Sequence, residues 1–315
     1  MNTHKQKISV IIPILNEQDS ISETIRRLVL VNDKHSREIE FEFIVVDDGS
    51  TDDSLTQLRI AAQQQSSIKV ISLSRNFGHQ IAITAGMDHA SGDYVAIIDG
   101  DLQDPPELIY NMYQIALRQG VDIVYGKRVS RAGETLFKKG TAALFYRLMR
   151  YMCEIDIPSD TGDFRLMSRR ATDSLKQMRE KHRFVRGMVP WMGFKSMPFE
   201  YARAERFAGE TKFPLRKMVA FASNAILSFS SKPLTLAIRI GIMLLAAGLM
   251  GGLYILYLKL FTNTTVPGLT AILLSIVIFS GIQILLIGVV GEYIARIFDE
   301  IKQRPLYFIG EKINM

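Results

Sequence analysis

Residues 94–104 read Tyr-Val-Ala-Ile-Ile-Asp-Gly-Asp-Leu-Gln-Asp. The first half is apolar without polar alternation, which is typical of a strand buried on both faces of a parallel sheet. The second half places acidic side chains directly after that strand. Ligands of open α/β sheets bind beyond the carboxyl ends of the strands. The stretch therefore predicts both a central strand and a candidate site, Asp99-Gly100-Asp101, at its end.

Further apolar runs alternate with helix-like segments on both sides of this stretch. The predicted strands are Ile8–Pro13, Phe43–Val46, Lys69–Leu73, Tyr94–Ile98 and Asp122–Tyr125. The predicted helices are Ser20–Val31, Ser54–Gln63, Gln80–Ala90 and Pro106–Gln119. This alternation predicts an open, doubly wound α/β fold with a mostly parallel sheet and helices outside it.

Polar or glycine-containing segments follow each predicted strand. They are Pro13–Glu17, Asp47–Ser50, Ser74–Gly78, Asp99–Asp104 and Gly126–Arg128. Each could be a turn by itself, because Asp and Gly are common in turns. Their shared position at one sheet edge indicates a binding site instead.

The carboxylates of this edge suit a phosphate-bearing ligand. Asp99 and Asp101 flank Gly100, and two such carboxylates can hold a hard divalent cation that also takes phosphate oxygens. Asp47 and Asp48 are acceptors suited to ribose hydroxyls or a base N–H. The sequence has neither G-x-x-x-x-G-K-[ST] nor a G-x-G-x-x-G at the first strand turn. This argues against a nucleoside triphosphatase and a dinucleotide oxidoreductase.

The composition limits the compartment and the partners. The 315 residues are 48% hydrophobic and carry a net charge of +6. A basic chain suits nucleic acid, an anionic membrane or phosphorylated substrates, and the apolar segments below favour the last two. Cys153 stands alone, so it has no partner for an internal disulfide and is expected to be a small buried hydrophobe. Met1–Lys7 lacks a signal-peptide pattern, so the first domain is expected in the cytosol.

Two uncharged stretches near the end of the chain are long enough to span a bilayer, Ile240–Leu258 and Val266–Gly291. The short polar turn Phe261–Thr265 between them predicts an antiparallel hairpin. Lys232, Arg239, Arg296, Lys302 and Arg304 flank the pair, whereas the turn has no Lys or Arg. The positive-inside rule then places both termini in the cytoplasm, in an inner (plasma) membrane protein that crosses twice. The alternative is a pair of buried helices in a soluble core.

The expected organisation has four parts. Residues 1–202 form the catalytic domain, 203–234 amphipathic juxtamembrane helices, 235–292 two spans at about 236–259 and 267–291, and 293–315 a cytosolic tail. Basic and apolar residues interleave over Arg203–Lys232, which suggests helices lying on anionic lipid; a solvated helix packed on the catalytic domain is the alternative. Glycines recur in both spans and permit close helix packing, either within the hairpin or between subunits. Packing between subunits would give a homo-oligomer.

Several motifs together resemble a known family. Ser9–Pro13 with Asn16-Glu17, Val46–Ser50 and Asp99–Asp104 resemble the inverting glycosyltransferases of the GT-A fold. Ser74–Gly78, Asp160–Leu166 and the terminal hairpin are similar to the polyprenyl-phosphate glycosyltransferases, most closely the bactoprenol (undecaprenyl-phosphate) glucosyltransferases. The resemblance covers essentially the whole chain.

The resemblance implies roles for particular residues. Asp99, Asp101 and Gln103 would bind the divalent metal, Mg²⁺ or Mn²⁺, and the diphosphate. The nucleotide-sugar site would comprise Pro13, Leu15, Glu17, Asp47, Asp48, Arg75, Asn76, Asp99 and Gly100. Asp160 and Asp163 would lie by the acceptor and act in catalysis with Asp101. The cations near the acceptor phosphate would be Arg128, Arg131, Lys138, Lys139 and Arg165.

The resemblance also implies the reaction. Glucose would pass from UDP-glucose to undecaprenyl phosphate with inversion, giving a lipid-linked sugar for glycan modification such as that of the lipopolysaccharide O-antigen. The sugar could instead be mannose from GDP-mannose, galactose or aminoarabinose. A phosphate with a second pKa of about 6 is already a nucleophile at neutral pH. Asp163 or Asp160 would thus orient and bind rather than abstract a proton.

Two histidines and the single tryptophan are open to other interpretations. His79 and His182 are expected to be loop or capping residues, with His79 close to the site. Trp191 could stack on a sugar, rest at the membrane interface or lie in the core.

Three other functions compete with this one. A processive polysaccharide synthase would carry a Gln-x-x-Arg-Trp segment, which is missing here. A membrane-anchored sugar-nucleotide binder would not need the full set of acidic and basic residues. Two spans per chain, with nearly all polar chemistry on the cytosolic side, argue against a lipid-linked sugar flippase.

Overall fold

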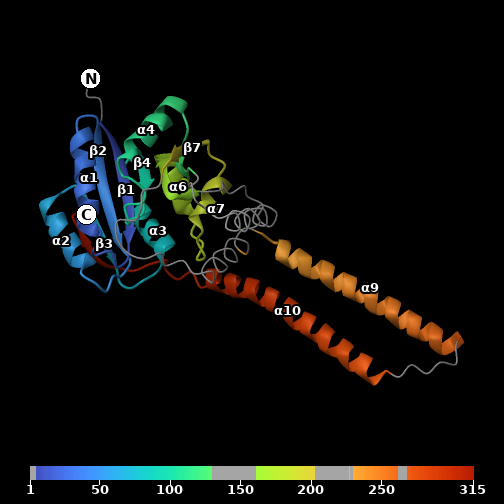
Figure 1. Ribbon diagram of the computed structural model, residues 1–315. Coiled ribbons are helices and arrows are strands. Elements are labelled where there is room, and N and C mark those ends of the chain that lie inside the picture. The colour runs from blue at the N-terminus through green and yellow to red at the C-terminus, as the bar shows by residue number, and fades with distance from the viewer. Residues whose placement is uncertain (1–4, 130–160, 203–226, 228–229, 262–267) are drawn as a thin grey trace.

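One mixed sheet organises the chain. The computed structural model describes residues 5–129, 161–202, 227, 230–261 and 268–315. Its eight strands lie in the order β7-β5-β6-β4-β1-β2-β3-β8, and a pair of long helices extends away from them (Figure 1).

The centre of the sheet is parallel, as the sequence predicts. Its strands are β1 (Gln6–Ile14), β2 (Ile39–Asp47), β3 (Ile68–Leu73) and β4 (Tyr94–Ile97). Strand β1 pairs in parallel with both β2 and β4, and β2 pairs in parallel with β3. Ile11, Ile44 and Ile97 are fully buried, since helices cover both faces.

The helices divide between the two faces of the sheet. One hydrophobic cluster takes side chains from α1 (Ile21–His35), α2 (Ser54–Gln64) and α4 (Leu108–Gln119). The other takes them from α3 (His79–His89), α6 (Arg169–Gln177) and α7 (Val185–Trp191). A Cβ at Gly86 would lie 2.4 Å from Ile11 Cγ2, so glycine lets α3 approach β1 closely. The doubly wound GT-A type of architecture is confirmed.

The far edge of the sheet departs from a simple parallel order. Strand β6 (Thr161–Ser168) runs antiparallel between β4 and β5 (Ile123–Arg128), and β7 (Ser196–Tyr201) pairs in parallel with β5. The sequence marks Asp160–Leu166 as a motif but does not predict a strand there. The strand is hidden in the sequence because two of its buried positions are charged, Asp163 and Arg165.

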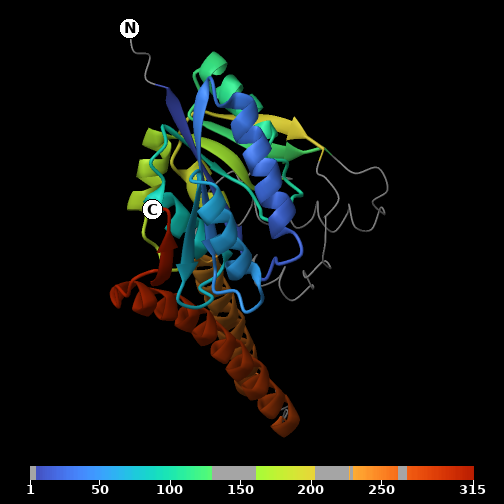
Figure 2. The ribbon, with the colours of Figure 1, turned by 90° about the vertical axis from the view of Figure 1, so that its left-hand side faces the viewer.

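The apolar stretches form α9 (Lys232–Phe261) and α10 (Leu269–Ile301). Both are long and apolar enough to cross a membrane, and their apolar windows, Lys232–Leu258 and Ile278–Ile301, are not buried against the described protein. They run beside one another away from the sheet (Figures 1 and 2). The described residues thus give no support to the alternative of two helices inside a soluble core.

The residues after α10 return to the catalytic domain. Strand β8 (Ile309–Ile313) pairs antiparallel with β3, and Ser74 N donates to Phe308 O at 2.9 Å. Asn314 Nδ2 donates to Ile68 O at 3.0 Å, and Arg59 Nη2 pairs with Glu311 Oε2 at 2.6 Å. The expected cytosolic tail therefore includes an edge strand, and the end of α10 is held beside the sheet.

Some predictions lie outside the described residues. They concern Cys153, most of the juxtamembrane segment, Asp160, Arg131, Lys138 and Lys139.

Candidate active site

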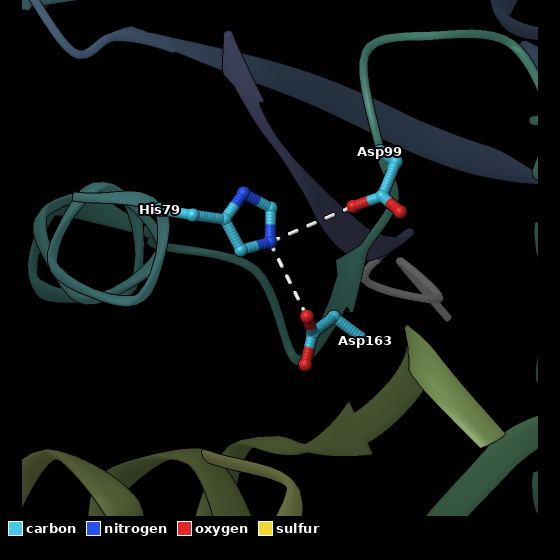
Figure 3. Close-up of side chains that lie close together, drawn as sticks. All are labelled: His79, Asp99 and Asp163. Atoms are coloured by element: carbon cyan, nitrogen blue, oxygen red, sulfur yellow. Dashed lines mark hydrogen bonds and ion pairs between the residues drawn. The ribbon is translucent and has the colours of Figure 1, made fainter. Parts of the chain in front are cut away.

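Three side chains from separate elements meet beyond the carboxyl end of β4 (Figure 3). His79 begins α3, Asp99 follows β4, and Asp163 lies on β6. His79 Nε2 is 3.2 Å from Asp163 Oδ2 and 3.6 Å from Asp99 Oδ1. One potential ligand atom from each residue lies within 4.8 Å of the others. Carboxylates only accept, so Nε2 donates to Asp163 when it carries a proton, and Asp99 lies just beyond hydrogen-bonding distance.

Asp163 is the most enclosed member of the group, with only 1% of its side chain exposed. Arg186 binds it bidentately, with Nε 3.1 Å from Oδ1 and Nη2 3.0 Å from Oδ2. Gln80 Nε2 adds a third donor to Oδ2 at 3.3 Å, beside the imidazole of His79. Burial alone would raise the pKa of Asp163, but Arg186 and His79 hold it well below its usual value. Asp163 is therefore a carboxylate at neutral pH, with both oxygens engaged.

Arg165 supports the backbone of the site, and its Nη2 also lies 3.8 Å from Asp163 Oδ1. Its side chain is 4% exposed, and it donates to Asp163 O at 3.1 Å and to Gly162 O at 3.0 Å. Burial lowers the pKa of this guanidinium to about 10. Arg165 thus fixes the backbone that carries Asp163. Arg128 crosses the same backbone, because a Cβ at Gly162 would lie 2.5 Å from Arg128 Nη2.

The acidic loop after β4 is tightly built. Gln103 N donates to Asp101 Oδ1 at 3.1 Å, and Leu102 adopts a left-handed φ of 60°. A Cβ at Gly100 would lie 2.7 Å from Ile14 Cγ2, so a side chain at this position would require Ile14 to shift. Asp104 at the end of the loop accepts a hydrogen bond from the Tyr201 hydroxyl.

This loop and its surroundings suit a divalent cation. Burial raises the pKa of Asp99 to about 6; the neighbouring carboxylates Asp104, Asp163 and Asp101 raise it too, and His79 opposes them. Carboxylates crowded in this way would be stabilised by a cation among them, and carboxylate oxygens are the ligands that Mg²⁺ and Mn²⁺ prefer. His79, Asp99 and Asp163 bring three potential ligand atoms together, but the Asp163 oxygens already accept from Arg186, His79 and Gln80. The predicted metal set, Asp99, Asp101 and Gln103, shares Asp99 with this group.

Two of the predicted nucleoside residues, Asp47 and Asp48, tie together the loops that follow β2 and β3. Asp47 accepts from Ser50 N at 2.9 Å and Ser72 Oγ at 2.7 Å, whereas Asp48 accepts from Phe77 N at 2.7 Å and Gly78 N at 2.8 Å. These bonds hold the loops after β2 and β3 in place. Burial raises the pKa of Asp48.

Gly49 joins these two loops. It has a φ of +73°, and a Cβ there would lie 2.5 Å from the carbonyl carbon of Arg75. The predicted donor-loop residues Arg75 and Asn76 thereby lie against the Asp47–Ser50 turn. Arg75 stacks over the Phe77 ring at 4.0 Å.

Of the other predicted nucleoside residues, Pro13 lies in β1, and Leu15 and Glu17 follow it. Ser20 Oγ donates to Glu17 Oε2 at 3.0 Å. Leu15 is 39% exposed. Pro13 O is 3.2 Å from the position that a Gly100 Cβ would take, so Pro13 lies against the acidic loop.

Comparison with known proteins agrees with this architecture. The model of the family described as Glycosyl transferase family 2 matches residues 9–176, more than half of the chain. The chain belongs to glycosyl transferase family 2. It is accordingly an enzyme, and the site at the end of β4 lies within the matched region.

Relatives of this glycosyltransferase match along its full length. "Uncharacterized glycosyltransferase YkcC" of Bacillus subtilis is 50% identical over 315 residues, covering 100% of this chain and 96% of the relative. "Bactoprenol glucosyl transferase" of Shigella phage SfII is 36% identical over 306 residues, covering 96% and 97%. Among solved structures, glucosyl-3-phosphoglycerate synthase from Mycobacterium tuberculosis with Mn²⁺ and uridine diphosphate is 22% identical, with a TM-score of 0.44 over 70% of this chain and 78% of that one.

The structure brings further residues of this glycosyltransferase to the site, and His79 lies close to it, as the sequence predicts. His79, expected to be a loop or capping residue, has its side chain in the group with Asp99 and Asp163. Gln80 and Arg186 contact Asp163, although no spacing in the sequence connects them with it. The only sequence feature that connects any of these residues with the site is the position of His79, directly after the Asn76–Gly78 turn.

The remaining candidates fall elsewhere. His182 pairs with Asp299 at the end of α10, at 3.3 Å. Trp191 is 63% exposed, which excludes the core interpretation.

Proposed function

We propose that this enzyme transfers a hexosyl group, glucose from UDP-glucose, to the phosphate of a membrane polyprenyl phosphate. The observation that carries the proposal is the full-length similarity to a relative named bactoprenol glucosyl transferase. That similarity spans 96% of this chain, so it includes α9 and α10 as well as the catalytic sheet. A lipid acceptor would give the apolar helices a role beyond attachment.

The proposed topology follows from the same parts. With α9 and α10 crossing the membrane as a hairpin, both of their outer ends lie on one side. The pairing of β8 with β3 supports this, since it keeps the end of α10 beside the catalytic sheet. We place that side in the cytoplasm, where nucleotide sugars are made, with both termini there.

The nucleotide sugar would bind along the ends of β1, β2 and β4. Glu17, Asp47 and Asp48 would border the nucleoside, and Arg75 would lie in a loop by the donor. A divalent cation, Mg²⁺ or Mn²⁺, held by Asp99, Asp101 and Gln103, would supply charge neutralisation for the diphosphate leaving group.

The side chains by β6 would serve the acceptor. The incoming phosphate is anionic and nucleophilic at neutral pH, so it needs orientation more than deprotonation. Asp163 is ionised and accepts hydrogen bonds from Arg186, His79 and Gln80, so it would orient these side chains. Arg128, with Arg131, Lys138 and Lys139, would draw the acceptor phosphate towards a donor that is also negative. In-line attack on the anomeric carbon would invert its configuration.

We also propose that α9 and α10 pack against a second copy of the chain. A Cβ built at Gly241, Gly248, Gly281 or Gly288 meets no atom of the described residues within 4 Å. Faces lined by glycine allow helices to approach closely in lipid. Cross-linking in native membranes tests this: a dimer or larger species supports the proposal, and a monomer alone contradicts it.

A donor panel tests the reaction itself. Purified enzyme in detergent receives undecaprenyl phosphate, Mg²⁺ or Mn²⁺, and one of the labelled donors UDP-glucose, UDP-galactose, GDP-mannose or an aminoarabinose nucleotide. We expect label in a butanol-soluble lipid with UDP-glucose. Label in that lipid from another donor would show that a different sugar is transferred by the same class of reaction. Labelled polymer would instead indicate a processive synthase, and donor binding without any product a sugar-nucleotide binder.

A further inference from the structure

Arg186 is the one cation among the described residues whose guanidinium grips the site carboxylate Asp163 through two hydrogen bonds. The two bonds, 3.1 Å to Oδ1 and 3.0 Å to Oδ2, fix the plane of the carboxylate. Asp163 Oδ2 then also accepts from His79 at 3.2 Å and from Gln80 at 3.3 Å. A carboxylate offers about four lone-pair positions, so these donors leave little capacity for a further proton.

A hydrogen bond from the neighbouring residue Val185 fixes the start of the helix that carries Arg186. Arg186 is the second residue of α7, and the first, Val185, donates its backbone N–H to Gln80 Oε1 at 3.0 Å. Gln80 therefore links α7 to Asp163 through both ends of its amide, because its Nε2 donates to the carboxylate. Gln80 also follows His79 directly on α3. The relative positions of α3, α7 and β6 are thus set by one hydrogen-bonded network.

The segment just before α7 contacts the end of α10. In the loop before α7, Lys181 N donates to Glu300 Oε1 at 2.6 Å, and His182 Nε2 lies 3.3 Å from Asp299 Oδ2. Both acidic residues belong to the last turns of α10. The loop that leads into the helix carrying Arg186 is consequently in contact with the end of α10.

We infer that Arg186 is a positioning residue for glycosyl transfer, which acts by locking the Asp163 carboxylate against His79 and Gln80. Asp163 then serves as a fixed anion that orients the donors around it. The side chain of Arg186 is 29% exposed and that of Asp163 is 1% exposed, so the guanidinium shields the carboxylate from solvent. The assay below rests on the proposed function, because it follows transfer to polyprenyl phosphate.

A double-mutant cycle tests this role. The variants are Arg186→Gln, Asp163→Asn and their combination, each measured for kcat, donor KM and thermal unfolding. Because Arg186 acts through Asp163, Arg186→Gln should lower kcat about 100-fold, the scale of a misplaced catalytic group. Donor KM should stay within about threefold, and the double variant should be no slower than Asp163→Asn alone.

A matched control separates this effect from the loss of any Arg–carboxylate pair. On α1, Arg26 binds Glu23 bidentately, with both distances at 2.6 Å, and it is 60% exposed. Arg26→Gln should leave kcat unchanged. If Arg186→Gln alone fails to fold, the double variant removes the uncompensated buried charge, and guanidinium added to Arg186→Ala provides a second test by restoring kcat.

Three results would overturn the inference. Losses in kcat that multiply in the double variant would mean that Arg186 acts on the substrates by itself. A donor KM that rises with unchanged kcat would make it a donor-binding residue. An unchanged kcat in Arg186→Gln would make the pair structural only. Failure of the proposed function is distinguishable, since it would remove lipid product from the wild type, while the unfolding cycle would still measure the coupling of Arg186 with Asp163.

Discussion

Replacing Glu42 by Gln should destabilise the catalytic sheet without touching the site. Glu42 lies on β2 and is buried, with 2% of its side chain exposed. Lys69 Nζ donates to Oε1 at 2.5 Å, while Ser9 Oγ at 2.6 Å and Ser91 Oγ at 2.9 Å donate to Oε2. A glutamine offers one acceptor oxygen in place of two, so its amide nitrogen would face donors that it cannot satisfy.

The pKa of Glu42 gives the size of the effect. Burial alone would raise this pKa, but the hydrogen bonds from Lys69, Ser9 and Ser91 lower it from 4.5 to about 2. At 1.36 kcal/mol per unit, this corresponds to about 3 kcal/mol of folding free energy at neutral pH. Because the folded pKa is depressed, the contribution is present above about pH 4.5 and is lost as the pH falls towards 2.

Calorimetry of the full chain in detergent measures this contribution. For a catalytic domain of this size, about 3 kcal/mol lowers Tm by about 6–12 °C. Glu40→Gln is the control, since Glu40 lies on the same strand but is exposed and pairs with Lys7 at 3.2 Å. The gap between wild type and Glu42→Gln should narrow to about 2 kcal/mol at pH 3.5. Equal melting of the two variants at pH 7, or a gap that widens in acid, would refute the reasoning.

Further predictions concern the site and its supports. Asp101→Ala should lower transfer about 100-fold or more in the labelled-lipid assay, and unchanged turnover would remove Asp101 from the proposed metal site. Gly49→Ala should raise donor KM and lower Tm, because a φ of +73° costs a residue with a Cβ about 1–2 kcal/mol and that Cβ would meet the backbone of Arg75 at 2.5 Å. Gly120→Ala is the control: at φ +59° with nothing within 4 Å, it should cost only the free energy of the left-handed backbone conformation. Glu300→Gln should speed amide exchange at Lys181, measured by mass spectrometry, and equal protection would show that the contact with α10 does not order that loop.

The sequence predicts the parts of the fold that follow from apolar burial. Strands β1 to β4 and helices α1 to α4 appear where uniform apolar runs and amphipathic segments place them. Strand β6 is not predicted, because Asp163 and Arg165 occupy buried positions where a buried strand is expected to have apolar side chains. Strand β8 is not predicted either, because it is short and partly exposed and so lacks a run of buried apolar residues.

The site is predictable only to the extent that its residues share a strand end. Asp99 follows β4 and is expected there, and Asp163 is found through the resemblance. Arg186 lies 23 residues beyond Asp163, on a helix that depends on tertiary contacts for its position. The sequence has no local pattern that brings such a pair together.

Acceptor dependence tests the central proposal most directly. Wild-type enzyme with labelled UDP-glucose and a divalent cation is incubated with undecaprenyl phosphate, with undecaprenol lacking the phosphate, or with no lipid, and the butanol phase is counted. The proposed reaction predicts label only with undecaprenyl phosphate. Equal label with undecaprenol, or none with the phosphate from any donor of the panel, would contradict it.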